Sequence, residues 1–427
     1  MIYEPVGHSI PLTSIFVYIK FGSIHETKPE YKGIAHFIEH MCFKGTKSLS
    51  PIEIVHTYDE IGAFLNAETS KQYTCYKIRC GNEHVAHSIQ VLSDIIMNSV
   101  FKSHEMDLER HVVFEEVLRL EDDPYTQIDD TIYKNLYAGS PYSDPIDTIS
   151  YHKHPHSLKT SDVLEMYHRF YQPQNMGISI VSNLSFESVK KMIRSSAFMK
   201  KSVDNPVSYV TLVPSIITPT RYVLNHKKGI QATNISVSFR TCPYGHKDMY
   251  ALFLLKNIIG GYMSSRLFMT LREKWGLTYT SKCNIEHHST SGHFEFYTMS
   301  KSTKVMPRNT SPGVLSLIFD IIDDLLVKGI TEKELHTAKG NFKGKFILGL
   351  EESERKCIHN GIEYILYDKP EIIHYEKMFE KVYEPVTKKE INELIRRYFR
   401  PENMLVCLVG EHLPDVKSVQ RICEYRR

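Results

Sequence analysis

An internal repeat constrains the fold of this 427-residue chain more than any other feature of its sequence. Residues 169–176 read RFYQPQNM and lead into the apolar run GISIVSN, and residues 397–404 read RYFRPENM and lead into LVCLVGE, an offset of 397 − 169 = 228 positions. Upstream, FVYIKFG at 16–22 has a weaker counterpart in SVSFRTC at 236–242. A repeat of this length predicts two related halves, each with strands and helices mixed.

The order of strand and helix signals predicts the class of fold. Hairpin-like pairs of strands occur at 64–80 and 279–300, and helical stretches lie between them at irregular intervals. This pattern favours an α+β fold over a doubly wound parallel sheet. Residues 201–220 contain three prolines and little helical periodicity, so we expect a linker there. The predicted domains are therefore 1–200 and 221–427, each an antiparallel-rich sheet with helices packed on one face.

Composition excludes several classes of partner. The formal net charge of +2 gives no reason to expect nucleic acid or an anionic membrane, and no apolar run reaches the ~20 residues that a membrane span needs. The eight cysteines are scattered and form no CxxC pair, which is typical of a reduced compartment. The N-terminus shows neither a secretory signal nor an Arg-rich presequence. We expect a cytoplasmic protein, with a mitochondrial location still open.

The string HFIEH places three polar residues with metal-site chemistry within five positions, namely His36, Glu39 and His40. On a helix, positions i and i+4 share a face, so both imidazoles can point at one zinc ion. Such a site commonly has a third protein ligand and a water that a neighbouring carboxylate can deprotonate. The alternative at this stage is a pair of core histidines with ordinary hydrogen-bond partners. Cys42 points off the ligand face and is expected in the core.

A candidate third ligand lies in residues 105–124, which we expect to form a helix. One stripe of this helix combines apolar and acidic residues: Glu109, Val112, Val113, Glu116 and Leu120. Buried carboxylates are costly unless they are paired or bound to metal, so the stripe favours Glu116 over the adjacent Glu115 as the ligand. Glu109 becomes a supporting partner. Without a metal, the same face predicts an inward ion pair with a basic residue.

With these residues in place, the chain resembles the inverted-zincin peptidases, the family of pitrilysin, insulin-degrading enzyme and the mitochondrial processing peptidase. GIAHFIEHMCFKGT at 33–46 is similar to the family signature, and Glu116 follows His40 by 116 − 40 = 76 positions, which fits the family spacing. The resemblance implies that His36, His40 and Glu116 bind one zinc ion per chain. It implies further that Glu39 is the general base and that Glu109 is an auxiliary glutamate.

Two further segments carry the resemblance along the chain. DEIGAFLNAETSKQYTCY is similar to the family segment that forms an edge strand beside the cleft, which implies that Phe64, Asn66 and Ala67 bind a peptide substrate through backbone pairing. The alternative for Asn66 is to cap a turn. In GGYMSSRLFMTLREKWGLTY, Arg272 and Tyr279 match residues that contact the substrate backbone or the developing oxyanion. The family fold implies a chamber between the two halves.

The second half carries no H-x-x-E-H string, which is the normal state of the family, so one zinc site per chain is expected. The two-repeat length resembles the processing peptidase and bacterial-type members, and it implies a zinc metalloendopeptidase acting as a homodimer or beside a related subunit. The alternative is a non-catalytic assembly subunit, similar to the core proteins of the respiratory bc complex. The chain starts later than is usual in the family, which we expect to weaken the first edge strand and to leave no room for a presequence.

Overall fold

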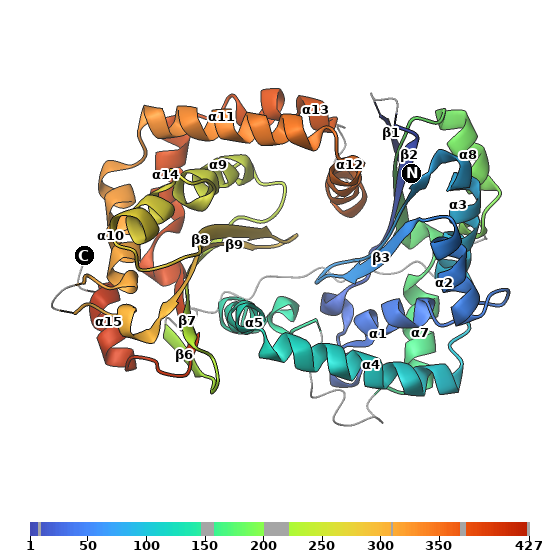
Figure 1. Ribbon diagram of the computed structural model, residues 1–427, viewed down its shortest axis with the longest axis horizontal. Coiled ribbons are helices and arrows are strands. Elements are labelled where there is room, and N and C mark those ends of the chain that lie inside the picture. Colours follow the sequence, from blue (N-terminus) through green and yellow to red (C-terminus); the bar gives the residue numbers. More distant parts are fainter. Residues whose placement is uncertain (7–9, 147–157, 200–221, 309–310, 368–372, 425–427) are drawn as a thin grey trace. The chain divides into compact units, whose positions relative to one another are not determined.

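The computed structural model divides into two compact units that interleave along the sequence (Figure 1). It describes residues 1–6, 10–146, 158–199, 222–308, 311–367 and 373–424, so the predicted linker at 201–220 lies outside the described residues. The N-terminal unit comprises Met1–Arg119, Asp144–Thr211 and Leu348–Glu376. The C-terminal unit comprises Leu120–Ser143, Leu212–Ile347 and Lys377–Arg427.

Each unit is built on one five-stranded sheet, and the two sheets have the same topology. The order is β1-β5-β2-β4-β3 in the N-terminal unit and β6-β10-β7-β9-β8 in the C-terminal unit. Among the described strands, β1–β5 and β6–β10 pair in parallel and the remaining pairs are antiparallel. The strands are β1 (Ile2–Pro5), β2 (Leu12–Ile19), β3 (Phe64–Thr69), β4 (Thr74–Gly81), β5 (Met176–Ser182), β6 (Tyr222–His226), β7 (Ala232–Thr241), β8 (Ser281–His287), β9 (Gly292–Lys301) and β10 (Met404–Gly410).

This topology confirms the predicted α+β class and the two related halves. The repeated strings RFYQPQNM and RYFRPENM lead into β5 and β10, which occupy equivalent places in the two sheets. Both predicted hairpins are present, as β3–β4 and β8–β9.

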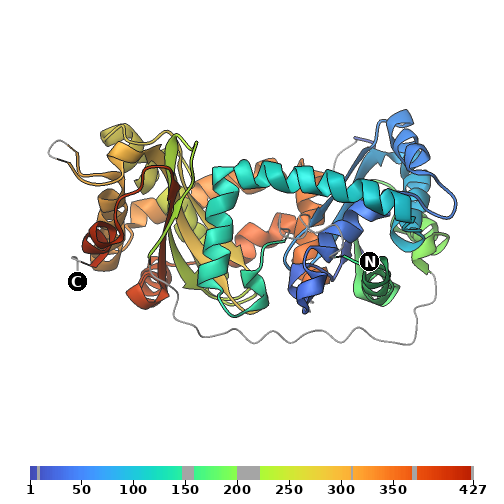
Figure 2. The same cartoon turned by 90° about the horizontal axis from the view of Figure 1, so that it is seen from below.

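Helices from the first half of the sequence, α5 excepted, pack on one face of the N-terminal sheet or on one another. Ile15, Val17 and Ile19 alternate along β2 toward that face and join a core with apolar residues of α1, α3 and α7. The helix α4 runs for 20 residues and is seen lengthwise in Figure 2. The helices of this half are α1 (Ile34–Cys42), α2 (Pro51–Glu60), α3 (Val85–Met97), α4 (Ser103–Asp122), α5 (Pro124–Leu136), α7 (Thr160–Phe170) and α8 (Phe186–Arg194).

The second half of the sequence contains a further set of helices. They are α9 (Met249–Gly260), α10 (Val314–Lys328), α11 (Glu332–Gly349), α12 (Ser353–Asn360), α13 (Tyr375–Met378), α14 (Lys388–Tyr398) and α15 (Val416–Glu424), with π-helical turns at Phe268–Lys274, Gly361–Leu366 and Phe379–Tyr383.

Each unit contains a helical segment from the other half of the sequence. Helix α5 packs on β10 and β7 in the C-terminal unit, and α12 packs on β5 and β2 in the N-terminal unit. In the N-terminal unit, Cys357 of α12 joins the core formed by Phe16 and Tyr18 of β2. The second face of that sheet is therefore covered as well, by a helix from the far end of the sequence.

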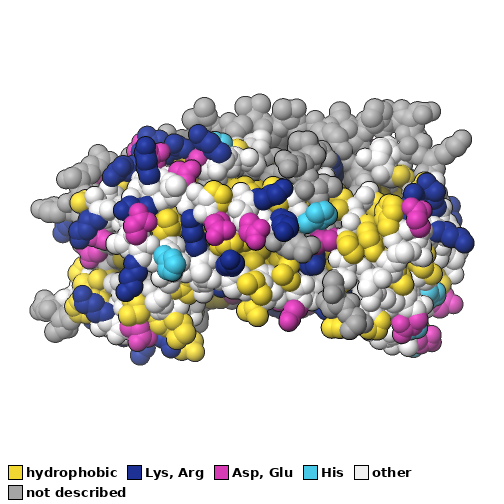
Figure 3. All heavy atoms as spheres, turned by 90° about the horizontal axis from the view of Figure 1, so that it is seen from above, with side chains coloured by type: hydrophobic (Ala, Val, Ile, Leu, Met, Phe, Trp, Pro, Cys, Tyr) yellow, Lys and Arg dark blue, Asp and Glu magenta, His cyan; other side chains and the backbone are white. Residues whose placement is uncertain are grey.

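Charged side chains of both signs are interspersed on the face shown in Figure 3, together with apolar ones. This distribution agrees with the near-neutral formal charge of +2. Within the described residues, every helix is too short or too polar to cross a lipid bilayer.

Candidate metal centre

Helix α1 carries His36 and His40, and its start is fixed by a buried acid. Gly33 adopts a left-handed backbone (φ 82°), and its N–H donates to Glu26 Oε2 at 2.9 Å. The N–H of Ala35 donates to Glu26 Oε1 at 2.9 Å, and Glu26 is only 1% exposed. A carboxylate that accepts two of the first N–H groups satisfies donors that have no partner within the helix.

Packing then fixes the rotation of α1. Phe37, Ile38 and Met41 are completely buried, so they turn one side of the helix into the core. His36 and His40, four positions apart, are left together on another side and stay partly exposed.

The structure brings His36, His40 and Glu116 together. The two Nε2 atoms lie 3.1 Å apart, and Glu116 Oε2 lies 3.2 Å from His40 Nε2 and 3.8 Å from His36 Nε2. Three ligands at tetrahedral corners around zinc, each about 2.0–2.1 Å from the ion, are separated by about 3.3 Å. The donor set and its spacing therefore fit a zinc ion with a fourth position open. Within the described residues, this is the one group of three or more metal-ligating side chains.

Helix α4 presents its acids to α1 at the edge of its buried face. Val113 is fully buried and Glu109 is 3% exposed, whereas the Glu116 side chain is 33% exposed and Glu115 points to solvent. The prediction that Val112 lies on the inward stripe is wrong, since Val112 is 51% exposed. Neighbouring residues on a helix are about 100° apart, so a face centred near Val113 excludes Val112.

Glu109 holds the second nitrogen of His40. Its Oε1 lies 2.8 Å from His40 Nδ1, and its Oε2 lies 2.5 Å from Lys44 Nζ. Burial alone would raise the pKa of Glu109, but the hydrogen bond to His40 and the Lys44 ammonium outweigh burial and hold that pKa below its usual range. An ionised Glu109 accepts the Nδ1 proton of His40 and leaves Nε2 to face the metal position.

The same contacts make His40 basic in the metal-free chain. Burial lowers the pKa of His40, but the hydrogen bonds to Glu109 and Glu116 outweigh burial and raise it to about 9. A metal ion that binds here must displace the Nε2 proton, so metal binding releases a proton to solvent.

Glu39 lies beside the metal-ligand group and is 8% exposed. Burial raises the pKa of Glu39, while the charges of His36 and His40 and a hydrogen bond from Thr69 lower it in part. Thr69 Oγ1 donates to Glu39 Oε2 at 2.5 Å. A buried carboxylate with a raised pKa beside a metal position is suited to accept a proton from a reacting water.

Sequence reasoning missed Lys44, Thr69 and Glu26. Thr69 could have been found from strand alternation, which places it on the same side of β3 as Leu65 and Ala67. Cys42 is fully buried in the core, which confirms its prediction.

Strand β3 is one of the two edge strands of the N-terminal sheet, and β1 is the other. Phe64 is 49% exposed, Asn66 is also exposed, and Ala67 is partly buried. The N–H of Ala67 donates to the side-chain Oδ1 of Asn66 at 2.9 Å, so the amide caps a backbone donor of the strand rather than a turn.

In the C-terminal unit, Arg272 and Tyr279 lie together. The Arg272 guanidinium is 4.9 Å from the Tyr279 ring centre and 4.8 Å from that of Phe268, and Tyr279 is 80% exposed. These predicted substrate contacts belong to the C-terminal unit, and the metal-ligand group belongs to the N-terminal unit.

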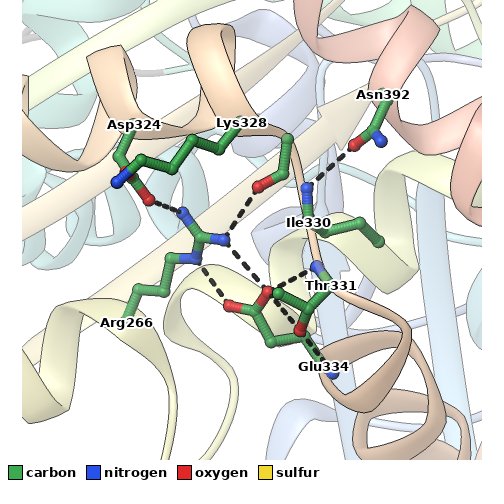
Figure 4. Close-up of polar contacts among 8 residues, drawn as sticks. Arg266, Asp324, Lys328, Ile330, Thr331, Glu334 and Asn392 are labelled. Atoms are coloured by element: carbon green, nitrogen blue, oxygen red, sulfur yellow. Dashed lines mark hydrogen bonds and ion pairs between the residues drawn. The ribbon is translucent and has the colours of Figure 1, made fainter.

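Arg266 anchors the segment that carries these two residues (Figure 4). Its guanidinium donates to both carboxylate oxygens of Glu334 (2.6 and 3.0 Å), to Asp324 Oδ2 (2.9 Å) and to the carbonyl of Gly329 (2.9 Å). A fork of this kind holds the start of the segment against the turn between α10 and α11.

Two family models match the chain. Residues 8–148 match the model described as "Insulinase (Peptidase family M16)", and residues 157–342 match "Peptidase M16 inactive domain". The first match contains the whole metal-ligand group.

Curated relatives and solved structures agree with these matches. The "Uncharacterized zinc protease YmxG" of Bacillus subtilis is 30% identical over 408 residues, covering 92% of both chains. An "Uncharacterized zinc protease" of Mycobacterium tuberculosis is 28% identical, covering 92% of this chain and 86% of the relative. Among solved structures, a protease from Helicobacter pylori shares the fold, with a TM-score of 0.86 at 21% identity and 96% coverage of both chains.

Proposed function

The chain belongs to peptidase family M16, and on that premise we propose that it is a zinc-dependent endopeptidase whose metal is held by His36, His40 and Glu116. Membership places the chain among the metallopeptidases. The observation that carries the finer proposal is the cluster of three ligand atoms 3.1 to 3.8 Å apart with the buried Glu39 beside it. We expect one ion per chain, because the described residues contain one such group.

The residues of the site divide the chemistry among them. When bound, zinc supplies Lewis acidity and lowers the pKa of a neighbouring water to about 7. Glu39 accepts the proton of the attacking water and returns it to the leaving amine. Glu109 keeps the Nδ1 proton of His40 in place, and Lys44 keeps Glu109 ionised.

The free edge of β3 supports a peptide substrate in extended form. Backbone pairing along Phe64, Asn66 and Ala67 would hold such a peptide largely independently of its side chains. The Ala67 N–H, now bonded to the Asn66 side chain, is a donor that an added strand can take over. We propose unfolded or presequence-like segments as substrates, with Arg272 and Tyr279 steadying the peptide or the oxyanion.

Replacing Glu39 with Gln tests the proposal. We expect Glu39→Gln to bind zinc as the wild type does, and to lose about 10²- to 10⁴-fold in the cleavage rate of a proteome-derived peptide library read by mass spectrometry. Glu60→Gln, at an exposed position on α2, is the matched control and should keep full activity. Cleavage by a clean preparation of Glu39→Gln at the wild-type rate would remove Glu39 from the mechanism.

Zinc uptake and assembly separate the remaining alternatives. A wild-type chain that takes up no zinc and cleaves nothing would favour a non-catalytic assembly subunit. We propose that the active form is a homodimer or a pair with a related subunit, and size-exclusion chromatography combined with activity of the isolated chain distinguishes these two.

A further inference from the structure

Thr69 occupies the end of β3, where the edge strand meets the proposed base. Burial alternates along the strand, with Phe64, Asn66 and Glu68 exposed and with Leu65 and Ala67 packed against the core that contains α1. The alternation places Thr69 on the α1 side of the sheet. Its hydroxyl donates to Glu39 Oε2 at 2.5 Å, a distance in the range of a hydroxyl bonded to a carboxylate.

We propose that Thr69 is a positioning residue that fixes the carboxylate of Glu39 for proton transfer, an inference that rests on the proposed function. A glutamate side chain has three rotatable bonds and two equivalent oxygens, so burial alone does not select which oxygen faces the reacting water. The Thr69 hydrogen bond occupies Oε2. Oε1 of Glu39 is then the oxygen that accepts the proton, and the same oxygen faces the reacting water in every catalytic cycle.

Thr69 also lies on the edge where the substrate would pair. The N–H of Ser70 donates to the carbonyl of Tyr73 at 2.7 Å, so the next pair along the hairpin, Thr69 and Thr74, is a pair without mutual backbone bonds. Pairs with and without mutual backbone bonds alternate along the hairpin, so Ala67, two residues before Thr69, is also in a pair without them. Its N–H accordingly donates to the Asn66 side chain of its own strand. The backbone N–H and C=O of Thr69 therefore point away from β4, toward the free edge.

One residue thus joins two functions of the site. Its backbone belongs to the row of groups that an extended peptide would pair with, and its side chain holds Glu39. A peptide paired along β3 would restrain the Thr69 backbone and with it the direction of the hydroxyl. We expect the effect of losing the hydroxyl to fall on the chemical step rather than on substrate binding.

Three variants test this inference. Thr69→Val keeps the shape and removes the donor, Thr69→Ser keeps the donor, and Thr74→Val is the matched control. Thr74 is Thr69's partner in the hairpin, and its hydroxyl donates to the carbonyl of Phe21 at 2.9 Å, away from Glu39. The probe is the peptide that the wild type cleaves fastest in the library, resynthesised with a fluorophore and a quencher.

We expect Thr69→Val to retain zinc and the wild-type KM while kcat falls by about 10- to 100-fold, and Thr69→Ser to restore most of kcat. Thr74→Val should lower the melting temperature and leave kcat near the wild-type value. Wild-type kcat in Thr69→Val, or a Thr69→Ser variant as slow as Thr69→Val, overturns the inference and leaves the proposed function standing. A wild type that cleaves no peptide refutes the proposed function first, and the role of Thr69 falls with it.

Discussion

Replacing Glu26 with Gln tests how the metal-binding helix is held in place. Both carboxylate oxygens of Glu26 accept backbone N–H groups at 2.9 Å, from Gly33 and Ala35, and the residue is 1% exposed. A Gln side chain offers one oxygen acceptor and turns an NH₂ group toward the other N–H. One buried donor of α1 is then left opposite another donor.

The cost follows from two contributions. Loss of a hydrogen bond to a charged group costs about 1.5–3 kcal/mol, and loss of a negative charge at a helix N-terminus adds about 0.3–1 kcal/mol. We therefore expect the free energy of unfolding of the N-terminal unit to fall by about 2–4 kcal/mol. For a unit of about 200 residues, this corresponds to a fall in melting temperature of about 5–15 °C.

Thermal melting followed by circular dichroism measures the change, with Glu30→Gln as the control because Glu30 is an exposed acid in the same loop. Zinc affinity should weaken in Glu26→Gln as well, since the two histidines depend on where α1 begins. Equal melting temperatures for Glu26→Gln and the Glu30→Gln control would refute the reasoning.

Two other variants address the ligand environment and the acid stability. Glu109→Gln removes the charge that orients His40, so we expect the zinc dissociation constant to rise about 10- to 100-fold. Competition with a chromophoric chelator measures this constant. The control Glu115→Gln, at an exposed position, should bind zinc with the wild-type dissociation constant. His293 is 1% exposed beside the Tyr137 hydroxyl (2.8 Å), and burial lowers its pKa to about 3. Because the folded pKa lies below the unfolded value near 6.5, its neutral form contributes fully above pH 6.5, and stability is lost as pH falls toward 3. His293→Gln should therefore flatten the pH dependence of the free energy of unfolding by up to about 1.4 kcal/mol per pH unit in that window; equal slopes for variant and wild type would contradict this.

Features that depend on local pattern were predictable from the sequence. The alternation in 64–80 predicted the β3–β4 hairpin, and the stripe on 105–124 predicted a helix that the structure places at Ser103–Asp122. The stripe erred at Val112 because an apolar residue at the border of a helical face can lie on either side of it. Helical periodicity alone locates the buried face of a helix to within about one residue, which corresponds to about 100° of rotation around the helix axis.

Strand alternation could have shown which face of β3 carries Thr69, but the partners that side chains reach across long stretches of sequence were not predictable. Thr69 acts on Glu39 from 30 positions away, and Glu26 caps α1 from a loop without regular period. The exchange of α5 and α12 between the sheets leaves no local signal either, since an amphipathic helix pattern does not say which sheet the helix covers.

Anomalous diffraction at the zinc edge from crystals of the zinc-loaded wild type tests the central claim most directly. We expect one peak per chain, within about 2.0–2.2 Å of His36 Nε2, His40 Nε2 and a carboxylate oxygen of Glu116. A peak at other side chains, or the absence of any peak in crystals grown with zinc, would contradict the assignment of this group as the metal centre.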